Sequence, residues 1–184
     1  MTKQEFKQYI PILEFGIWEF HLDNLDIPYL IKECYEVKDK NKKGVKKSNI
    51  GGYQSSEIDI MGNPKFYFLI DRLNKLIQKF FISPNIHLDS AWINISSKGH
   101  WNSIHTHNTN IDEVKKKSGV LYLQATSKSG AIGFTNPLSS AHQYLIKPQP
   151  GQLLMFSQLH PHYVEPNNSD QDRISIAFNC NQYK

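Results

Sequence analysis

Residues 119–165 are GVLYLQATSKSGAIGFTNPLSSAHQYLIKPQPGQLLMFSQLHPHYVE, in which short apolar segments alternate with Gly, Pro, Asn and Ser. Short segments rich in β-branched and aromatic residues, bounded by turn-forming residues, are typical of strands. The same pattern continues on both sides of this stretch. It predicts strands over 88–96, 119–126, 131–135, 143–147, 151–157, 161–165 and 173–180. Seven short strands at this spacing indicate a β-sandwich or a β-barrel.

The first part of the chain predicts more helix. Residues 12–22 are aromatic and partly alternating, which indicates one early strand. A helix is expected to begin at Asp26, with a proline in its first turn, where a missing N–H costs little. A second helix is expected to begin at Asn63 and to end before Pro84, because the apolar residues between them recur at helical spacing.

Length and composition are those of one folded domain. The chain has 184 residues, of which 39% are hydrophobic and 21% charged, and these values exclude a disordered chain, a coiled coil and a collagen-like fibre. We expect residues 1–184 to form a single domain. Within it, residues 1–85 would support a β-barrel core formed by residues 86–181.

Several features bear on location and partners. No apolar stretch approaches the roughly 18 residues of a membrane span, and the first residues lack the apolar segment of a secretory signal. Cys34 and Cys180 are too few for a disulfide framework. These features predict a cytoplasmic protein without a membrane partner. Residues 38–47 carry six lysines and predict a solvated loop; no aromatic residues are interleaved with them, which argues against nucleic acid as a partner.

Histidines suggest a metal site. His105 and His107 are separated by one residue, so in an extended segment both imidazoles point to the same face and can reach one metal ion. A third ligand must come from elsewhere in the chain. His162 is the best candidate and His160 competes with it, because Pro161 between them makes the alternation unreliable. Imidazole suits iron, zinc, copper and nickel, so these ligands alone do not select the metal.

One of the two arginines opens a strongly alternating strand, RISIAFN (173–179). Alternation places Arg173, Ser175, Ala177 and Asn179 on one face and the apolar residues between them on the other. If the polar face lines a barrel, a buried guanidinium there needs an anionic partner, and a carboxylate that binds it with both oxygens is suitable. A salt bridge to a protein carboxylate and an exposed edge strand are the alternatives.

Together, these residues resemble the iron(II)- and 2-oxoglutarate-dependent oxygenase superfamily. Its pattern is HxD or HxE, a distal His some 50 or more residues later, and an Arg or Lys about ten residues beyond that. The chain is most similar to a branch of small oxygenases from marine bacteria and their phages, which implies a bacterial or phage-infected host cell. The resemblance implies a mainly β fold with flanking helices, a double-stranded β-helix or jelly-roll barrel. It is carried by SNIGGYQS (48–55), AWINISSKGHWNSIHTHN (91–108), SGVLYL (118–123), IGFTNP (132–137), PGQLLMFSQLHPHYVEPN (150–167) and RISIAFN (173–179).

The resemblance implies that His105 and His162 are the two histidine ligands of the metal, with His162 preferred to His160. His107 stands where the superfamily usually has a carboxylate. A third neutral imidazole leaves the metal site more positive than a carboxylate does. Asp112 would supply a carboxylate instead if the loop that carries it folds back towards the metal.

The resemblance also implies a binding site for 2-oxoglutarate. Arg173 would bind its distal carboxylate, and Ser175, one pleat along the same strand face, would donate a hydrogen bond. Tyr122 would supply a second hydroxyl, or else be an ordinary barrel tyrosine. Asn94, on an alternating strand, would line the pocket.

The implied enzyme is an Fe(II)- and 2-oxoglutarate-dependent dioxygenase that uses O2, hydroxylates a C–H bond and releases succinate and CO2. Its substrate, a small molecule or a peptide, is left open, as is its oligomeric state. One alternative is a cupin-type metalloenzyme with three histidines that does not use 2-oxoglutarate. Another is a non-catalytic jelly roll that binds its ligand through Tyr53, Trp92, Trp101 and the lysine-rich loop. SNIGGYQS (48–55) would shape the substrate pocket or form a turn with a packed tyrosine.

Overall fold

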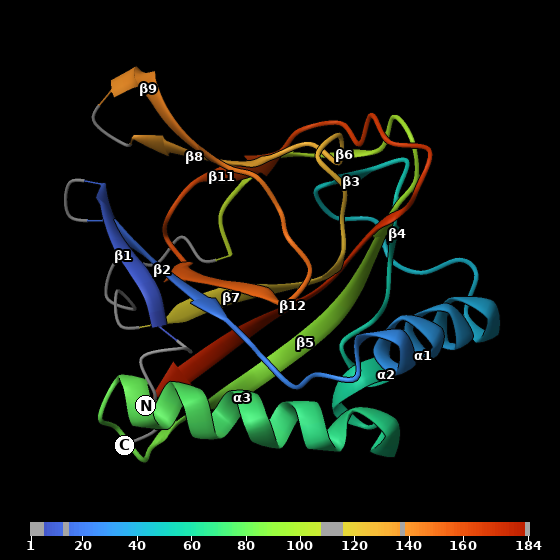
Figure 1. The fold of residues 1–184 in the computed structure, drawn as a ribbon, viewed down its shortest axis with the longest axis horizontal. Coiled ribbons are helices and arrows are strands. Elements are labelled where there is room, and N and C mark those ends of the chain that lie inside the picture. Colours follow the sequence, from blue (N-terminus) through green and yellow to red (C-terminus); the bar gives the residue numbers. More distant parts are fainter. Residues whose placement is uncertain (1–5, 13–14, 108–115, 137–138, 183–184) are drawn as a thin grey trace.

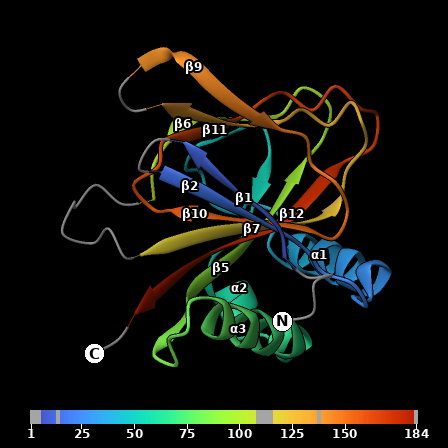
Figure 2. The same ribbon diagram turned by 60° about the vertical axis from the view of Figure 1, so that its left-hand side comes forward.

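The computed structural model describes residues 6–12, 15–107, 116–136 and 139–182. It shows two facing antiparallel sheets, with helices against the outer face of the larger sheet (Figure 1). Figure 2 shows the smaller sheet on one side of the larger sheet and the helices on the other. The predicted fold class, a mainly β double-stranded β-helix with flanking helices, is confirmed.

The larger sheet has the strand order β1-β2-β10-β7-β12-β5-β4. Its strands are β1 (Phe6–Ile12), β2 (Phe15–His21), β4 (Tyr53–Gln54), β5 (Ile86–Ser96), β7 (Lys117–Gln124), β10 (Gln152–Ser157) and β12 (Arg173–Gln182). The long strand β12 pairs with β5 on one side and with β7 on the other. Three strands that precede residue 86 therefore belong to the same sheet as strands of the predicted barrel core. The division of the chain into a supporting part, residues 1–85, and a core, residues 86–181, stays a prediction.

The smaller sheet has the order β3-β6-β11-β8-β9. Its strands are β3 (Asn49–Ile50), β6 (Trp101–His105), β8 (Ile132–Asn136), β9 (Ser139–Ile146) and β11 (His162–Val164). All seven strands predicted between 88 and 180 are present, although their first and last residues differ from the predicted ones. Strand β6 was not predicted, because its sequence WNSIH has little apolar alternation.

Helices cover one face of the larger sheet. The helix α1 (Ile27–Lys40) begins where the Asp26 carboxylate accepts a hydrogen bond from the Tyr29 backbone N–H, as predicted. A short 3₁₀ turn (Pro64–Phe66) leads into α3 (Tyr67–Phe80), and α2 (Ile58–Met61) is a single turn. Among the helices that the structure describes, none is long and apolar enough to span a membrane.

Two of the sequence-based boundaries are wrong. The early strand predicted over 12–22 is β2, but it begins at Phe15; Ile12 instead ends β1, an additional strand that pairs with β2. The lysine-rich segment 38–47 is not all loop, because α1 continues through Lys40 before the chain turns. Helical spacing of the apolar residues Leu30, Cys34 and Val37 carries the helix into the first lysines.

Apolar side chains gather on both faces of the larger sheet. Ile174, Ile176 and Phe178 of β12 are buried against the helices, as their alternation predicts. On the other face, a second cluster fills part of the space between the sheets and includes Phe134 of β8 and Phe156 of β10. The remaining space between the sheets is a cavity of about 570 Å³.

Candidate active site

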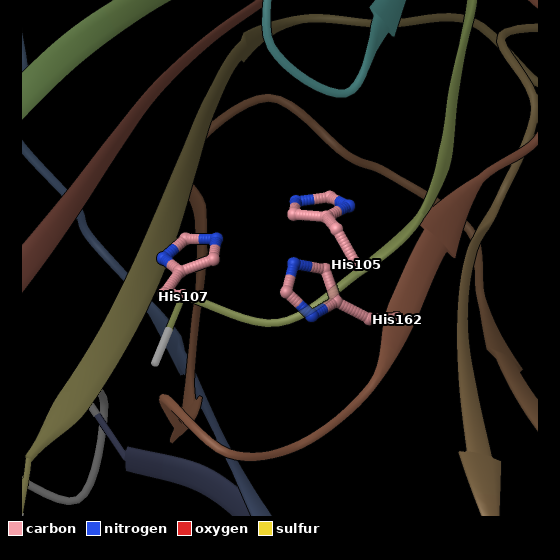
Figure 3. Close-up of side chains that lie close together, drawn as sticks. All are labelled: His105, His107 and His162. Carbon is pink, nitrogen blue, oxygen red and sulfur yellow. The ribbon is translucent and has the colours of Figure 1, made fainter. Parts of the chain in front are cut away.

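Three histidines meet at this cavity. His105 ends β6, His107 follows two residues later, and His162 begins β11, where it is the cross-strand partner of His105. Figure 3 shows the three rings close together, and one nitrogen of each lies within 4.8 Å of the others. The structure therefore brings together the three histidines that the sequence singled out, and a three-histidine site is present.

Each of these imidazoles uses its Nδ1 atom for a hydrogen bond. The Nδ1 of His105 lies 2.8 Å from the Ser103 carbonyl oxygen, and that of His162 lies 2.8 Å from the His160 carbonyl oxygen. The Nδ1 of His107 lies 2.7 Å from Asn179 Oδ1. Because a backbone carbonyl oxygen only accepts, Nδ1 carries the proton in His105 and His162, and their lone pair is on Nε2. A proton at Nδ1 held by an oxygen is the usual arrangement of a histidine that binds metal through Nε2.

Burial keeps the three rings neutral. Removal from water lowers the pKa of His105, lowers that of His107 to about 4, and lowers that of His162 well below its usual value. Proximity of the rings to one another lowers the pKa values of His107 and His162 further. Neutral imidazole is the form that binds a metal, so the cluster is in its binding form at neutral pH.

His160 and Asp112 were the alternative ligands. The Nε2 atom of His160 lies 3.1 Å from the Thr135 carbonyl oxygen, and His160 is not a member of the three-histidine cluster. Asp112 falls in 108–115, outside the described residues.

Arg173 lines the same cavity as the histidines. Its side chain is buried, and its Nη1 donates hydrogen bonds to the carbonyl oxygens of Ser129 and Glu165. Burial lowers its pKa, although the guanidinium stays charged. Among the described residues, no carboxylate forms an ion pair with it. The charge of the Glu165 carboxylate partly offsets the lowering of the Arg173 pKa, but it forms no ion pair with the guanidinium, so this arrangement still suits an anionic ligand.

The other predicted contacts of the co-substrate surround Arg173. Ser175 is the cross-strand partner of Asn94 on β5 and of Tyr122 on β7, so these three residues are neighbours across three strands. All three line the cavity. Burial raises the pKa of Tyr122 to about 12, which keeps its phenol protonated and able to donate a hydrogen bond.

Sequence reasoning missed several residues of the site. Asn179 and Ser118 hold His107, yet the only available signal was that Asn179 shares the polar face of the arginine strand. Trp92, which the sequence suggests only as a ligand contact of a non-catalytic jelly roll, lines the cavity with its ring 5.4 Å from that of His107. The segment 48–55 combines both of its expected roles, because Ser48 and Gln54 line the cavity while Tyr53 is buried in the core.

Comparison with known proteins identifies the fold. The structure is similar to that of the non-heme alpha-ketoglutarate-dependent carbocyclase SnoK of nogalamycin biosynthesis, with a TM-score of 0.75 and 12% identity over 91% of this chain and 79% of the other. A Pseudomonas putida prolyl-4-hydroxylase has a TM-score of 0.69 and 17% identity over 93% and 95% of the two chains. The viral collagen prolyl hydroxylase of Paramecium Bursaria Chlorella virus-1, solved with 2-oxoglutarate, has a TM-score of 0.65 and 16% identity over 91% and 96%. No curated protein sequence matches the chain.

A double-stranded β-helix with imidazoles and a buried arginine between its sheets fits the class of iron(II)- and 2-oxoglutarate-dependent oxygenases. More particularly, residues 90–179 match the model of the family described as "Putative 2OG-Fe(II) oxygenase". This match and the structural neighbours support the 2OG-Fe(II) oxygenase superfamily and an oxygenase enzyme. Its cofactor is Fe(II), and its co-substrates are 2-oxoglutarate and O2. The finer assignment to a marine bacterial and phage branch stays a prediction.

The residues present fit this cofactor. Imidazole is a common ligand of iron, and three neutral rings offer three converging lone pairs. The departure from the superfamily pattern is His107, which stands in place of a carboxylate. Three neutral ligands leave the full double charge of Fe(II) in the site, which favours an anionic co-substrate such as 2-oxoglutarate.

Proposed function

We propose that the enzyme hydroxylates a C–H bond of its substrate and releases succinate and CO2. The observation that carries this proposal is a single cavity lined by three neutral imidazoles and by a buried arginine that has no carboxylate partner among the described residues. This arrangement joins a site for a divalent metal to a site for a dicarboxylate. When bound, Fe(II) with 2-oxoglutarate and O2 supplies the oxidising chemistry.

In this proposal, His105, His107 and His162 hold the Fe(II) through their Nε2 atoms. The Arg173 guanidinium binds the distal carboxylate of 2-oxoglutarate, because Ser129 and Glu165 occupy Nη1 and leave its other N–H groups for a ligand. The hydroxyl groups of Ser175 and Tyr122 donate to the same co-substrate, and Asn94 completes the wall beside them. The protein thereby orients the co-substrate by its two ends.

The prime substrate, a small molecule or a peptide, binds beside the metal site in the same cavity. There the wall is formed by polar residues of the segment 47–57, among them Lys47, Ser48 and Gln54. The Ser48 hydroxyl lies 3.4 Å from the Nε2 atom of His105, so this wall is directly beside the metal site. A substrate that contacts it would present its C–H bond next to the metal.

Anaerobic binding tests this function. Purified protein should bind Fe(II) and then 2-oxoglutarate, and on addition of O2 it should release succinate, measured by mass spectrometry. The Arg173→Ala variant should still bind Fe(II) but should no longer bind 2-oxoglutarate. Arg72→Ala is the matched control, since Arg72 bonds to the backbone of residues 23 and 24 on the helical side and does not line the cavity. Protein that binds Fe(II) but neither binds nor decarboxylates 2-oxoglutarate would contradict the proposal.

A site of three imidazoles also fits one alternative, a cupin-type metalloenzyme that does not use 2-oxoglutarate. In that enzyme, the three histidines would matter and Arg173 would not. Equal metal-dependent activity of the Arg173→Ala variant and the parent, without succinate, would support that alternative.

A further inference from the structure

The three histidines differ in what holds their Nδ1 atoms. His105 and His162 each bond to the backbone carbonyl oxygen two residues earlier in the chain. Any residue type could provide these two acceptors. His107 instead bonds to a side chain 72 residues away, on β12 of the opposite sheet. Its orientation therefore depends on one particular residue, Asn179.

Asn179 is the centre of a small polar network. Its Oδ1 lies 2.7 Å from the Nδ1 atom of His107 and accepts a 2.7 Å hydrogen bond from the Ser118 hydroxyl. Its Nδ2 donates to the Ser90 hydroxyl at 3.2 Å. Ser118 and Ser90 are buried, and the Ser118 oxygen also lies 2.7 Å from the Nδ1 atom of His107. Among the described residues, both atoms at hydrogen-bond distance from His107 Nδ1 are therefore oxygens, those of Asn179 and Ser118.

The orientation of the amide decides the tautomer of His107. With Oδ1 towards the ring, Ser118 donates to Oδ1 and its lone pairs face Nδ1, so both oxygens accept from a proton on Nδ1. With the amide turned over, Nδ2 would donate to Nδ1, and the proton would move to Nε2, where it blocks metal binding. The structure has the first orientation, with Nδ2 donating to the Ser90 hydroxyl.

We propose that Asn179, held by Ser118 and Ser90, is the positioning residue that makes His107 the third metal ligand. Its amide oxygen keeps the proton of His107 on Nδ1 and directs the Nε2 lone pair towards His105 and His162. The inference rests on the proposed function, because it assigns the purpose of the network to metal binding. It also means that β12 contributes to both binding sites, because Arg173 would bind the co-substrate and Asn179 would orient the metal ligand His107.

The first test needs no metal and no variant. In metal-free protein labelled with ¹⁵N-histidine, long-range ¹H–¹⁵N spectra report which ring nitrogen carries the proton, and His107→Gln assigns the signals. We expect His107 to be protonated at Nδ1 at neutral pH. A proton on Nε2 of His107 in the parent protein would overturn the inference.

The second test is Fe(II) affinity, measured anaerobically by competition with a chromophoric chelator. Asn179→Leu removes the acceptor at similar size, and we expect affinity to fall by about 10- to 100-fold, the usual effect of losing such a partner. Asn179→Asp keeps an oxygen acceptor on the side of His107 and should bind at least as tightly as the parent. Ser118→Ala should weaken binding less than Asn179→Leu does.

Asn181→Leu is the matched control. It changes the same residue type on the same strand, two residues further on, away from the cavity lining, and should leave Fe(II) affinity unchanged. Parent-like affinity of folded Asn179→Leu, or an equal loss in Asn179→Asp, would contradict the role of Asn179. If the parent binds Fe(II) with the expected variant effects but does not bind 2-oxoglutarate, the inference is supported and the proposed function alone fails.

Discussion

At the scale of single residues, both the charge and the geometry of the side chains determine which ligand the site would bind. In the proposed site, His107 stands where the superfamily usually has a carboxylate, and as a neutral ligand it would leave the metal site more positive. Arg173 adds a second buried cation, and no carboxylate among the described residues forms an ion pair with it. Two positive centres in one cavity favour a ligand with two carboxylates. The planar guanidinium is better suited than an ammonium group to hold one of them with two parallel hydrogen bonds.

Arg173→Lys tests this geometric requirement. Lysine keeps the charge but lacks the planar fork, and the carbonyl oxygens of Ser129 and Glu165 would compete for its ammonium protons. We expect the binding free energy of 2-oxoglutarate to become less favourable by up to about 1.5–3 kcal/mol, the scale of a hydrogen bond to a charged group. Anaerobic calorimetry of the Fe(II)-loaded variant measures it. Affinity equal to that of the parent would show that charge alone is sufficient.

His162→Ala tests the choice of the distal ligand. One ring nitrogen of His162 lies within 4.8 Å of a nitrogen of each of the other two rings, so we expect its loss to abolish measurable Fe(II) binding. His160→Ala is the control, because His160 bonds to the Thr135 backbone and lies outside the cluster. Metal content after anaerobic loading, compared between folded samples, distinguishes the two residues. Equal metal content in both variants would contradict the assignment of His162.

At the scale of elements, β12 shows what the sequence could predict. RISIAFN alternates strictly, so both its strand structure and the residues on each face follow from period-2 geometry, and the cavity is indeed lined by Arg173, Ser175, Ala177 and Asn179. Strands β3 and β4 have two residues each, too few to show any period. The contact of Asn179 with His107 depends on how two sheets face each other, which no local pattern encodes.

The apolar face of β12 should matter for stability and not for ligand binding. Ile176 is 1% exposed and packs against the helices, so Ile176→Ala removes buried methyl groups and leaves a cavity there. We expect the free energy of unfolding to fall by about 2–5 kcal/mol. Urea denaturation measures this loss. The 2-oxoglutarate affinity of the folded variant should stay within about twofold of the parent, and a loss of affinity without a loss of stability would contradict the division of the strand into two faces.

At the scale of the whole molecule, the site lies between the two sheets and draws on both. His105 and His162 belong to the smaller sheet, whereas Arg173, Tyr122 and Asn179 belong to the larger sheet. The contact between His107 and Asn179 joins the sheets beside the cavity. A polar, desolvated cluster at this junction favours metal binding, but it also makes the metal-free fold sensitive to acid.

The lowered pKa of His107 determines how the free energy of unfolding changes with pH. In the unfolded chain His107 has its ordinary pKa of about 6.5, whereas burial lowers the pKa to about 4 in the folded protein. Between these values the unfolded state binds the proton first, so the free energy of unfolding decreases as the pH falls from 6.5 to 4, by up to roughly 3 kcal/mol from this residue. Above pH 6.5 His107 contributes no pH dependence. Urea denaturation of metal-free protein at several pH values, compared with His107→Gln, isolates this contribution. Parallel curves for the two proteins between pH 6.5 and 4 would show that the buried imidazole is not the cause.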